Sequence, residues 1–200
     1  MLLLVTLGFA SPIMAEEAKR VVMLGDSITA GYGLAAGEEL PAQLEKALES
    51  EGIAATVENA GVSGDTSAGG LSRLDWAIQG EPDLVIVALG ANDGLRGVDP
   101  ADTRNNLSAI IDRLRQKGAR VVLAGMYAPP NMGAEYGERF NRIYPEIAAE
   151  QDVRLYPFLL DGVAADPSLN QADGIHPNAE GARIIAGRLA EAIAPVLKSP

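Results

Sequence analysis

The chain has no cysteine, a single histidine and few aromatic residues: one tryptophan, five tyrosines and three phenylalanines in 200 positions. Without cysteine there can be no disulfide, no thiolate metal ligand and no cysteine nucleophile. The lone histidine, His176, excludes the multi-histidine sites that hold zinc or iron. No acidic loop has the spacing of a calcium-binding hand. We therefore expect neither a metal nor a cofactor.

Basic residues are also scarce, with 16 lysines and arginines against 27 aspartates and glutamates, a net charge of -11. An acidic surface is repelled by nucleic-acid phosphates and by anionic lipid headgroups. We expect no nucleic-acid partner and no stable membrane insertion of the mature chain. The composition, 48% hydrophobic and 22% charged, is that of a folded domain, and the length suits a single one. Nothing in it indicates a particular oligomeric state.

Residues 1–15 (MLLLVTLGFASPIMA) form an apolar run that ends before the charged pair Glu16 and Glu17. The run resembles the hydrophobic core and cleavage site of a secretory signal, although the usual basic leader is missing. It is too short to span a bilayer. The alternative is a buried first strand or helix. On the signal interpretation, residues 16–200 form the mature domain, which is periplasmic or secreted.

After this run, short aliphatic segments alternate with longer segments of helical period, the pattern of a parallel sheet covered by helices on both faces. The predicted strands are residues 20–24, 55–58, 83–89, 120–124 and 153–155. Four apolar stripes predict helices, and they comprise Leu40, Leu44, Ala47 and Leu48; Leu107, Ile110, Ile111 and Leu114; Phe140, Ile143 and Ile147; and Ile185, Leu189, Ile193 and Val196. The sequence thus predicts one α/β domain.

Open parallel sheets bind ligands at the carboxyl ends of their strands, so the polar residues there are candidates for a site. Ser27 follows the first strand between glycines (GDSITAG), which would let a substrate carbonyl approach its hydroxyl. The alternative is a helix N-cap serine. Gly64 follows the second strand and Asn92 the third, and taken singly each is better explained by a turn, Gly64 in one leading to a helix capped by Thr66 or Ser67.

His176 lies three residues after Asp173 and directly before Pro177. The proline disfavours helix at the histidine, so the pair is predicted in a loop. In such a turn the carboxylate can bind one ring nitrogen and leave the other free to act as a base. A surface histidine is the alternative. Asn178 is predicted to cap the last helix.

Together these residues resemble the SGNH (GDSL) hydrolase family, whose serine, glycine, asparagine and histidine match Ser27, Gly64, Asn92 and His176. The similarity is strongest to its arylesterase, thioesterase I and lysophospholipase branch, through stretches such as SGDTS, NDGLRG and DGIHP. Two small departures are Ile28, where the motif has leucine, and Ala91, where that branch often has glycine.

The resemblance implies a flavodoxin-like three-layer α/β/α sandwich with five parallel strands in the order 2-1-3-4-5. It also implies that Ser27, His176 and Asp173 form a catalytic triad. The backbone N–H groups of Ser27 and Gly64 and the side-chain amide of Asn92 would form the oxyanion hole. The expected activity is hydrolysis of aryl or short-to-medium acyl esters, with acyl thioesters and lysophospholipids as further substrates.

The segment after the fourth strand, residues 126–132, is expected to border the acyl pocket through Met126, Tyr127, Pro129 and Met132, although packing in the core would explain any one of them equally well. Trp76 and the remaining aromatic residues are expected in the core. Two other functions fit the same pattern less well. A flavodoxin-like ligand-binding module needs no Asp173–His176 pair, and an acyltransferase would pass the acyl group to an alcohol instead of water.

Overall fold

A computed structural model of the chain describes residues 17–199. Its sheet has five parallel strands in the order β2-β1-β3-β4-β5. The strands are β1 (Lys19–Gly25), β2 (Ala55–Gly61), β3 (Leu84–Ala88), β4 (Arg120–Ala124) and β5 (Arg154–Tyr156). The predicted α/β class and strand order are confirmed. The hypothesis of a signal in residues 1–15 falls outside the described residues.

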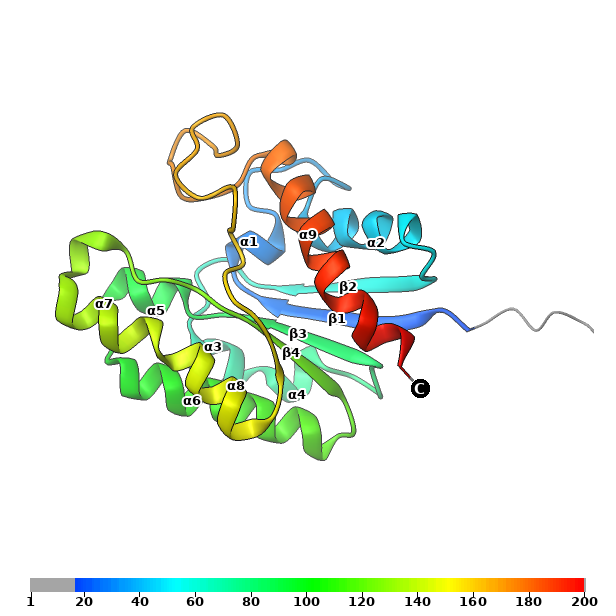
Figure 1. The fold of residues 1–200 in the computed structure, drawn as a ribbon, viewed down its shortest axis with the longest axis horizontal. Coiled ribbons are helices and arrows are strands. Elements are labelled where there is room, and N and C mark those ends of the chain that lie inside the picture. Colours follow the sequence, from blue (N-terminus) through cyan, green and yellow to red (C-terminus); the bar gives the residue numbers. More distant parts are fainter. Residues whose placement is uncertain (1–16, 200) are drawn as a thin grey trace, which may run out of the picture.

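Helices cover both faces of the sheet and give a three-layer α/β/α sandwich (Figure 1). One face carries α1 (Ser27–Ala30), α2 (Leu40–Ser50) and α9 (Ala179–Lys198). The other carries α3 (Ser67–Ser72), α4 (Leu74–Ala77), α5 (Ala91–Arg96), α6 (Pro100–Gln116), α7 (Ala134–Asn141) and α8 (Ile143–Gln151). A short 3-10 helix, η1, spans Pro130–Met132.

The core lies on both sides of β3, the central strand, because helices pack against both of its faces. All five residues of β3 are buried, which explains why its sequence is a continuous apolar run. In α6, Leu107, Ile110, Ile111 and Leu114 are fully buried, as their spacing predicted. The edge strand β2 is instead partly exposed along its length. Asn178 caps α9 through a bond from the N–H of Gly181 at 3.0 Å, as predicted.

Two expectations need correction. The stripe through Phe140, Ile143 and Ile147 lies on two helices, α7 and α8, which are separated at Arg142. Pro145 follows closely and has no N–H to donate to the carbonyl four residues earlier, so the regular helix cannot continue. Trp76 is not a core residue, because it is 75% exposed on the short helix α4.

The topology places the ends of three strands at one level. Gly25 at the end of β1 pairs with Gly61 of β2 on one side and with Ala88 of β3 on the other. The chain passes from β1 outward to β2 and then crosses to β3, so the strand order reverses between β1 and β3. Loops diverge at such a point and leave a crevice.

The contrast between Ile86 and Trp76 can be tested by truncation. Ile86→Ala removes a fully buried side chain from β3 and should lower the free energy of unfolding by about 2–5 kcal/mol. Trp76→Ala removes an exposed side chain and should change it by no more than about 0.5 kcal/mol. Urea denaturation of both variants measures the difference. A Trp76→Ala loss equal to that of Ile86→Ala would contradict this description of the core.

Candidate active site

Ser27 is the first residue of α1, directly after the turn that ends β1. The N-cap of this helix is Asp26, whose Oδ1 accepts a hydrogen bond from the N–H of Ile28 at 3.0 Å. Capping therefore does not occupy the Ser27 hydroxyl, which rules out the N-cap interpretation of this serine. The turn depends on Gly25, since a Cβ there would lie 1.9 Å from Thr29 Oγ1.

The side chain of His176 reaches the hydroxyl of Ser27 at the carboxyl end of the sheet. Nε2 of the histidine lies 2.8 Å from Ser27 Oγ, and Nδ1 lies 2.7 Å from Asp173 Oδ2. When Nδ1 carries the proton and donates a hydrogen bond to the carboxylate, Nε2 is free to accept a hydrogen bond from the serine hydroxyl. The structure thus joins the three residues of the expected triad in one line of hydrogen bonds.

The carboxylate of Asp173 is held by its own loop. Its Oδ1 accepts from the backbone N–H groups of His176 at 3.0 Å and Ile175 at 2.9 Å. Hydrogen bonds from the backbone and ring of His176, together with the one from Ile175, lower the pKa of Asp173 to about 2. The carboxylate is therefore ionised at neutral pH and can stabilise an imidazolium beside it.

A side chain that the sequence analysis missed ties the histidine loop to the serine loop. Nε2 of Gln171 donates to the carbonyl of Tyr32 at 2.6 Å and to that of Pro177 at 3.0 Å. Its backbone N–H donates to the carbonyl of His176 at 2.8 Å. No spacing in the sequence signals this role, because the bond to Tyr32 crosses 139 residues.

An open cavity of about 240 Å³ adjoins Ser27 and His176. Its other lining residues are Asp26, Ile28, Tyr32, Ser63, Gly64, Ala91, Asn92, Leu95 and Ile175. The three residues that carry the expected oxyanion donors therefore line one space. The backbone N–H groups of Ser27 and Gly64 have no backbone acceptor within residues 17–199, so they are free to bind a ligand.

Local contacts fix the position of Gly64. Its φ of +84° is in the left-handed region, which only glycine adopts without strain. Nη2 of Arg96 donates to its carbonyl at 2.8 Å and so holds the peptide group. The nearby Thr66 caps α3 by accepting from the N–H of Gly69 at 3.2 Å, as the turn interpretation predicted. The helix cap and a role for Gly64 are therefore compatible.

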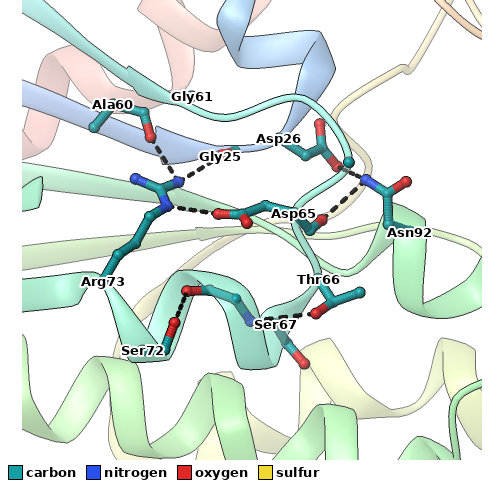
Figure 2. A network of polar contacts seen from close by, with 12 residues as sticks. Gly25, Asp26, Ala60, Gly61, Asp65, Thr66, Ser67, Ser72, Arg73 and Asn92 are labelled. Atoms are coloured by element: carbon teal, nitrogen blue, oxygen red, sulfur yellow. Dashed lines mark hydrogen bonds and ion pairs between the residues drawn. The ribbon is translucent and has the colours of Figure 1, made fainter.

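Asn92 is the second residue of α5, and hydrogen bonds from its side-chain amide fix the orientation of that amide. Nδ2 donates to the carbonyl of Asp65 at 2.9 Å and lies 3.4 Å from Asp26 Oδ2 (Figure 2). The next residue, Asp93, is fully buried and accepts hydrogen bonds from Ser67 and Thr103. This buried carboxylate joins α5 to α3 and α6 and so fixes the helix that carries Asn92.

The four loop residues expected at the acyl pocket are absent from the lining of this cavity. Met126 is buried in the core, and Tyr127 stacks on Phe158 with ring centroids 4.5 Å apart. Pro129 and Met132 lie against the glycines of α5 and its C-cap. Their part in substrate binding stays a prediction.

One aromatic residue expected in the core borders the cavity instead. Tyr32 is 55% exposed, and the centroid of its ring lies 4.7 Å from that of His176. It therefore covers one face of the imidazole. The sequence offers a hint, since Tyr32 stands between two glycines in the loop after Ser27, but an isolated tyrosine in a loop has no specific meaning.

Two classes of feature are absent from the described part of the chain. Residues 17–199 contain no cluster of three or more histidine, aspartate or glutamate side chains placed to hold a metal ion. Among their helices, none combines the length and the hydropathy needed to span a bilayer.

A partly exposed serine–histidine–aspartate line at the crevice of a parallel α/β sheet, beside unpaired N–H donors, is the arrangement expected of a serine hydrolase. The comparison with known families agrees with this class. The GDSL-like Lipase/Acylhydrolase family matches residues 23–184, and the chain belongs to that family.

Named relatives cover almost the whole chain. Esterase TesA of Pseudomonas aeruginosa is 44% identical over 182 residues, 90% of this chain and 89% of its own. Thioesterase 1/protease 1/lysophospholipase L1 of Escherichia coli K12 is 40% identical, covering 92% and 87%. The crystal structure of esterase EstA from Pseudoalteromonas sp., inhibited by monoethylphosphonate, has a TM-score of 0.85 at 32% identity and covers 90% and 100%. The chain is therefore an enzyme of the esterase type.

The buried carboxyl of Asp26 gives a pH-dependent prediction. Burial raises the pKa of Asp26 to about 6. The hydrogen bond from the N–H of Ile28 and the charge of His176 lower this pKa, but by less than burial raises it. Between the unfolded pKa near 4 and the folded pKa, the folded state binds more protons, so its stability falls as pH rises. Relative to Asp26→Asn, the wild-type free energy of unfolding should fall by up to about 3 kcal/mol between pH 4 and 7.5.

Urea denaturation at the two pH values measures this fall. The control is Asp166→Asn, which removes an exposed carboxyl whose pKa is lowered by Ser168, and which should not reproduce the effect. A difference between wild type and Asp26→Asn that stays constant with pH would show that Asp26 titrates normally.

Proposed function

We propose that the enzyme hydrolyses carboxylic esters through an acyl-enzyme formed on Ser27. The observation that carries the proposal is the unbroken line from Asp173 through His176 to the serine hydroxyl, at 2.7 and 2.8 Å. A serine hydroxyl is a weak nucleophile unless a base lies within hydrogen-bond reach, and here the base is the only histidine of the chain.

In the first half-reaction, Ser27 Oγ attacks the ester carbonyl and His176 Nε2 takes its proton. Asp173 stabilises the imidazolium without accepting the proton. The negative oxygen of the tetrahedral intermediate is bound by the N–H groups of Ser27 and Gly64 and by the amide of Asn92. In comparable sites each such donor lowers the barrier by roughly 3–4 kcal/mol. The imidazolium then protonates the leaving alcohol as the carbon–oxygen bond breaks.

In the second half-reaction, water takes the place of the alcohol. His176 removes a proton from the water, whose oxygen attacks the acyl carbonyl in the same oxyanion hole. Collapse of this intermediate releases the carboxylic acid and returns the proton to Ser27. The cavity is open to solvent on one side, which gives water access to the acyl group.

The size and lining of the cavity favour aryl and short-to-medium acyl esters. Ile28, Tyr32, Leu95 and Ile175 give it apolar walls, and about 240 Å³ is below the usual range for drug-sized ligands. Leu95 and Ile175 are 46% exposed and widen the apolar surface at the mouth. The names of the relatives make acyl thioesters and lysophospholipids further candidates. Export to the periplasm or medium is proposed from residues 1–15 alone.

Replacing the nucleophile is the direct test. Ser27→Ala should lower kcat for p-nitrophenyl butyrate by at least about a thousandfold, because no other group can form the acyl-enzyme. Its thermal unfolding should match the wild type, since the hydroxyl caps no helix. Aryl esters, acyl thioesters, lysophospholipids and acetylated sugars, assayed with and without added alcohol, then define substrate and acceptor. Wild-type turnover in Ser27→Ala would end the proposal.

The base predicts a pH profile. Since attack needs the neutral imidazole, kcat/KM should rise with pH between 5 and 8. Asp173, with a pKa of about 2, is ionised throughout and cannot produce the rise. Asp26, with a pKa of about 6, could contribute, so the profile is measured in Asp26→Asn as well. A profile that is flat, or that becomes flat in Asp26→Asn, would argue against His176 as the base.

A further inference from the structure

Arg73, directly after α3, reaches the loops that carry the site (Figure 2). Its Nε donates to Asp65 Oδ2 at 2.5 Å. Its Nη2 donates to the carbonyl oxygens of Gly25 at 3.0 Å and Ala60 at 2.9 Å. The Arg73 and Asp65 side chains are only 15% and 16% exposed, so the pair is largely withdrawn from solvent. One guanidinium thus joins the end of β1 to the segment that runs from the end of β2 to Asp65.

The three acceptors lie close in sequence to the oxyanion donors. Gly25 is two residues before Ser27, on the same turn. Ala60 is four residues before Gly64, and Asp65 is the residue directly after Gly64. Any movement of the guanidinium would therefore shift the two segments that present the backbone donors.

Backbone pairing alone does not fix the spacing of these segments. The β1-β2 ladder ends at the pair Gly25 and Gly61, and one further bond runs from the N–H of Val62 to the carbonyl of Gly25 at 3.1 Å. Beyond this point the two loops diverge. The Nη2 of Arg73, shared between Gly25 and Ala60, holds the ends of both strands together from the side.

The third donor depends on the same pair through Asp65. The backbone carbonyl of Asp65 accepts one N–H of the Asn92 amide at 2.9 Å, which leaves the second N–H for an oxyanion. The competing contact to Asp26 Oδ2, at 3.4 Å, is long for a hydrogen bond. The Asp65 carboxylate is confined, because a Cβ on Gly69 would lie 2.5 Å from its Oδ1.

We propose that the Arg73–Asp65 pair positions all three donors of the oxyanion hole. The proposal rests on the function proposed above and makes Arg73 and Asp65 positioning residues, since neither side chain lines the cavity. It also requires arginine specifically. Only the planar fork can bind a carboxylate through Nε and two carbonyls through Nη2 at once, whereas a lysine amine is a single point donor.

The first measurement is steady-state hydrolysis of p-nitrophenyl butyrate by Arg73→Lys and Asp65→Asn. Each should lower kcat by about tenfold or more, because the donors act in the transition state, and leave KM within about threefold. The matched control is Arg183→Lys. Arg183 also pairs with a carboxylate, binding Glu180 through Nε and Nη2, but on the exposed surface of α9, so kcat should not change.

A double-mutant cycle with Asn92→Ala separates positioning from general stabilisation. If Arg73 acts through the donors, Arg73→Lys should cost clearly less in the Asn92→Ala background than in the wild type. The pH midpoint of kcat/KM should stay unchanged, because the triad is not touched. An equal loss in both backgrounds, a pure KM effect or an unchanged kcat would each overturn the proposal.

Folding is controlled by titrating active serines with a phosphonate ester and dividing turnover by their number. A loss that disappears after this correction means that the pair only stabilises the fold, and overturns the proposal. Asp65→Asn retains an oxygen for Arg73 and provides the test if Arg73→Lys does not fold. If the wild type does not exceed Ser27→Ala on the whole substrate panel, the proposed function fails, independently of Arg73.

Discussion

The hydrogen bond between His176 Nε2 and Ser27 Oγ, 2.8 Å long, joins groups 149 residues apart in the chain. Every other feature of the site serves this contact or the space beside it. The serine is the first residue of α1, just after a buried strand, and its hydroxyl is free of helix capping. The histidine is held on a loop by the bonds of Asp173 and Gln171. Both supports are local, but their meeting depends on the whole sheet.

The sheet makes that meeting possible because all five strands are parallel, so their carboxyl ends lie at one edge. The same end of the sheet collects the proposed oxyanion donors from the segments after β1, β2 and β3. The hydrogen-bonded ladders of the sheet end where these loops begin. Beyond that point, polar side chains hold the loops in position. Asp93, Arg96 and the Arg73–Asp65 pair have this role, and each makes hydrogen bonds to backbone or buried polar groups.

The sequence predicted most of the fold, because buried parallel strands are continuous apolar runs and helices have an apolar period. The β3 run and the stripe of α6 are clear examples. Its failures have physical causes. On α4 the fully buried side chain is that of Leu74, and Trp76, two residues later, is on the exposed side of the helix. The expected pocket role of residues 126–132 stays a prediction, because the place of a loop depends on tertiary packing. In the structure Met126 is buried, Tyr127 stacks on Phe158, and Pro129 and Met132 lie against α5 and its C-cap.

The sequence by itself determined the class of fold and the chemical groups available, since residue types and periodicity are local properties. One histidine, one acidic residue three positions before it and one serine between glycines left few choices for a nucleophile and its base. Only the tertiary structure decided that these groups meet, that Tyr32 covers the imidazole, and that Arg73 joins the donor loops. These contacts join residues that are tens to more than a hundred positions apart in the chain. A local sequence pattern does not show how close such residues lie in space.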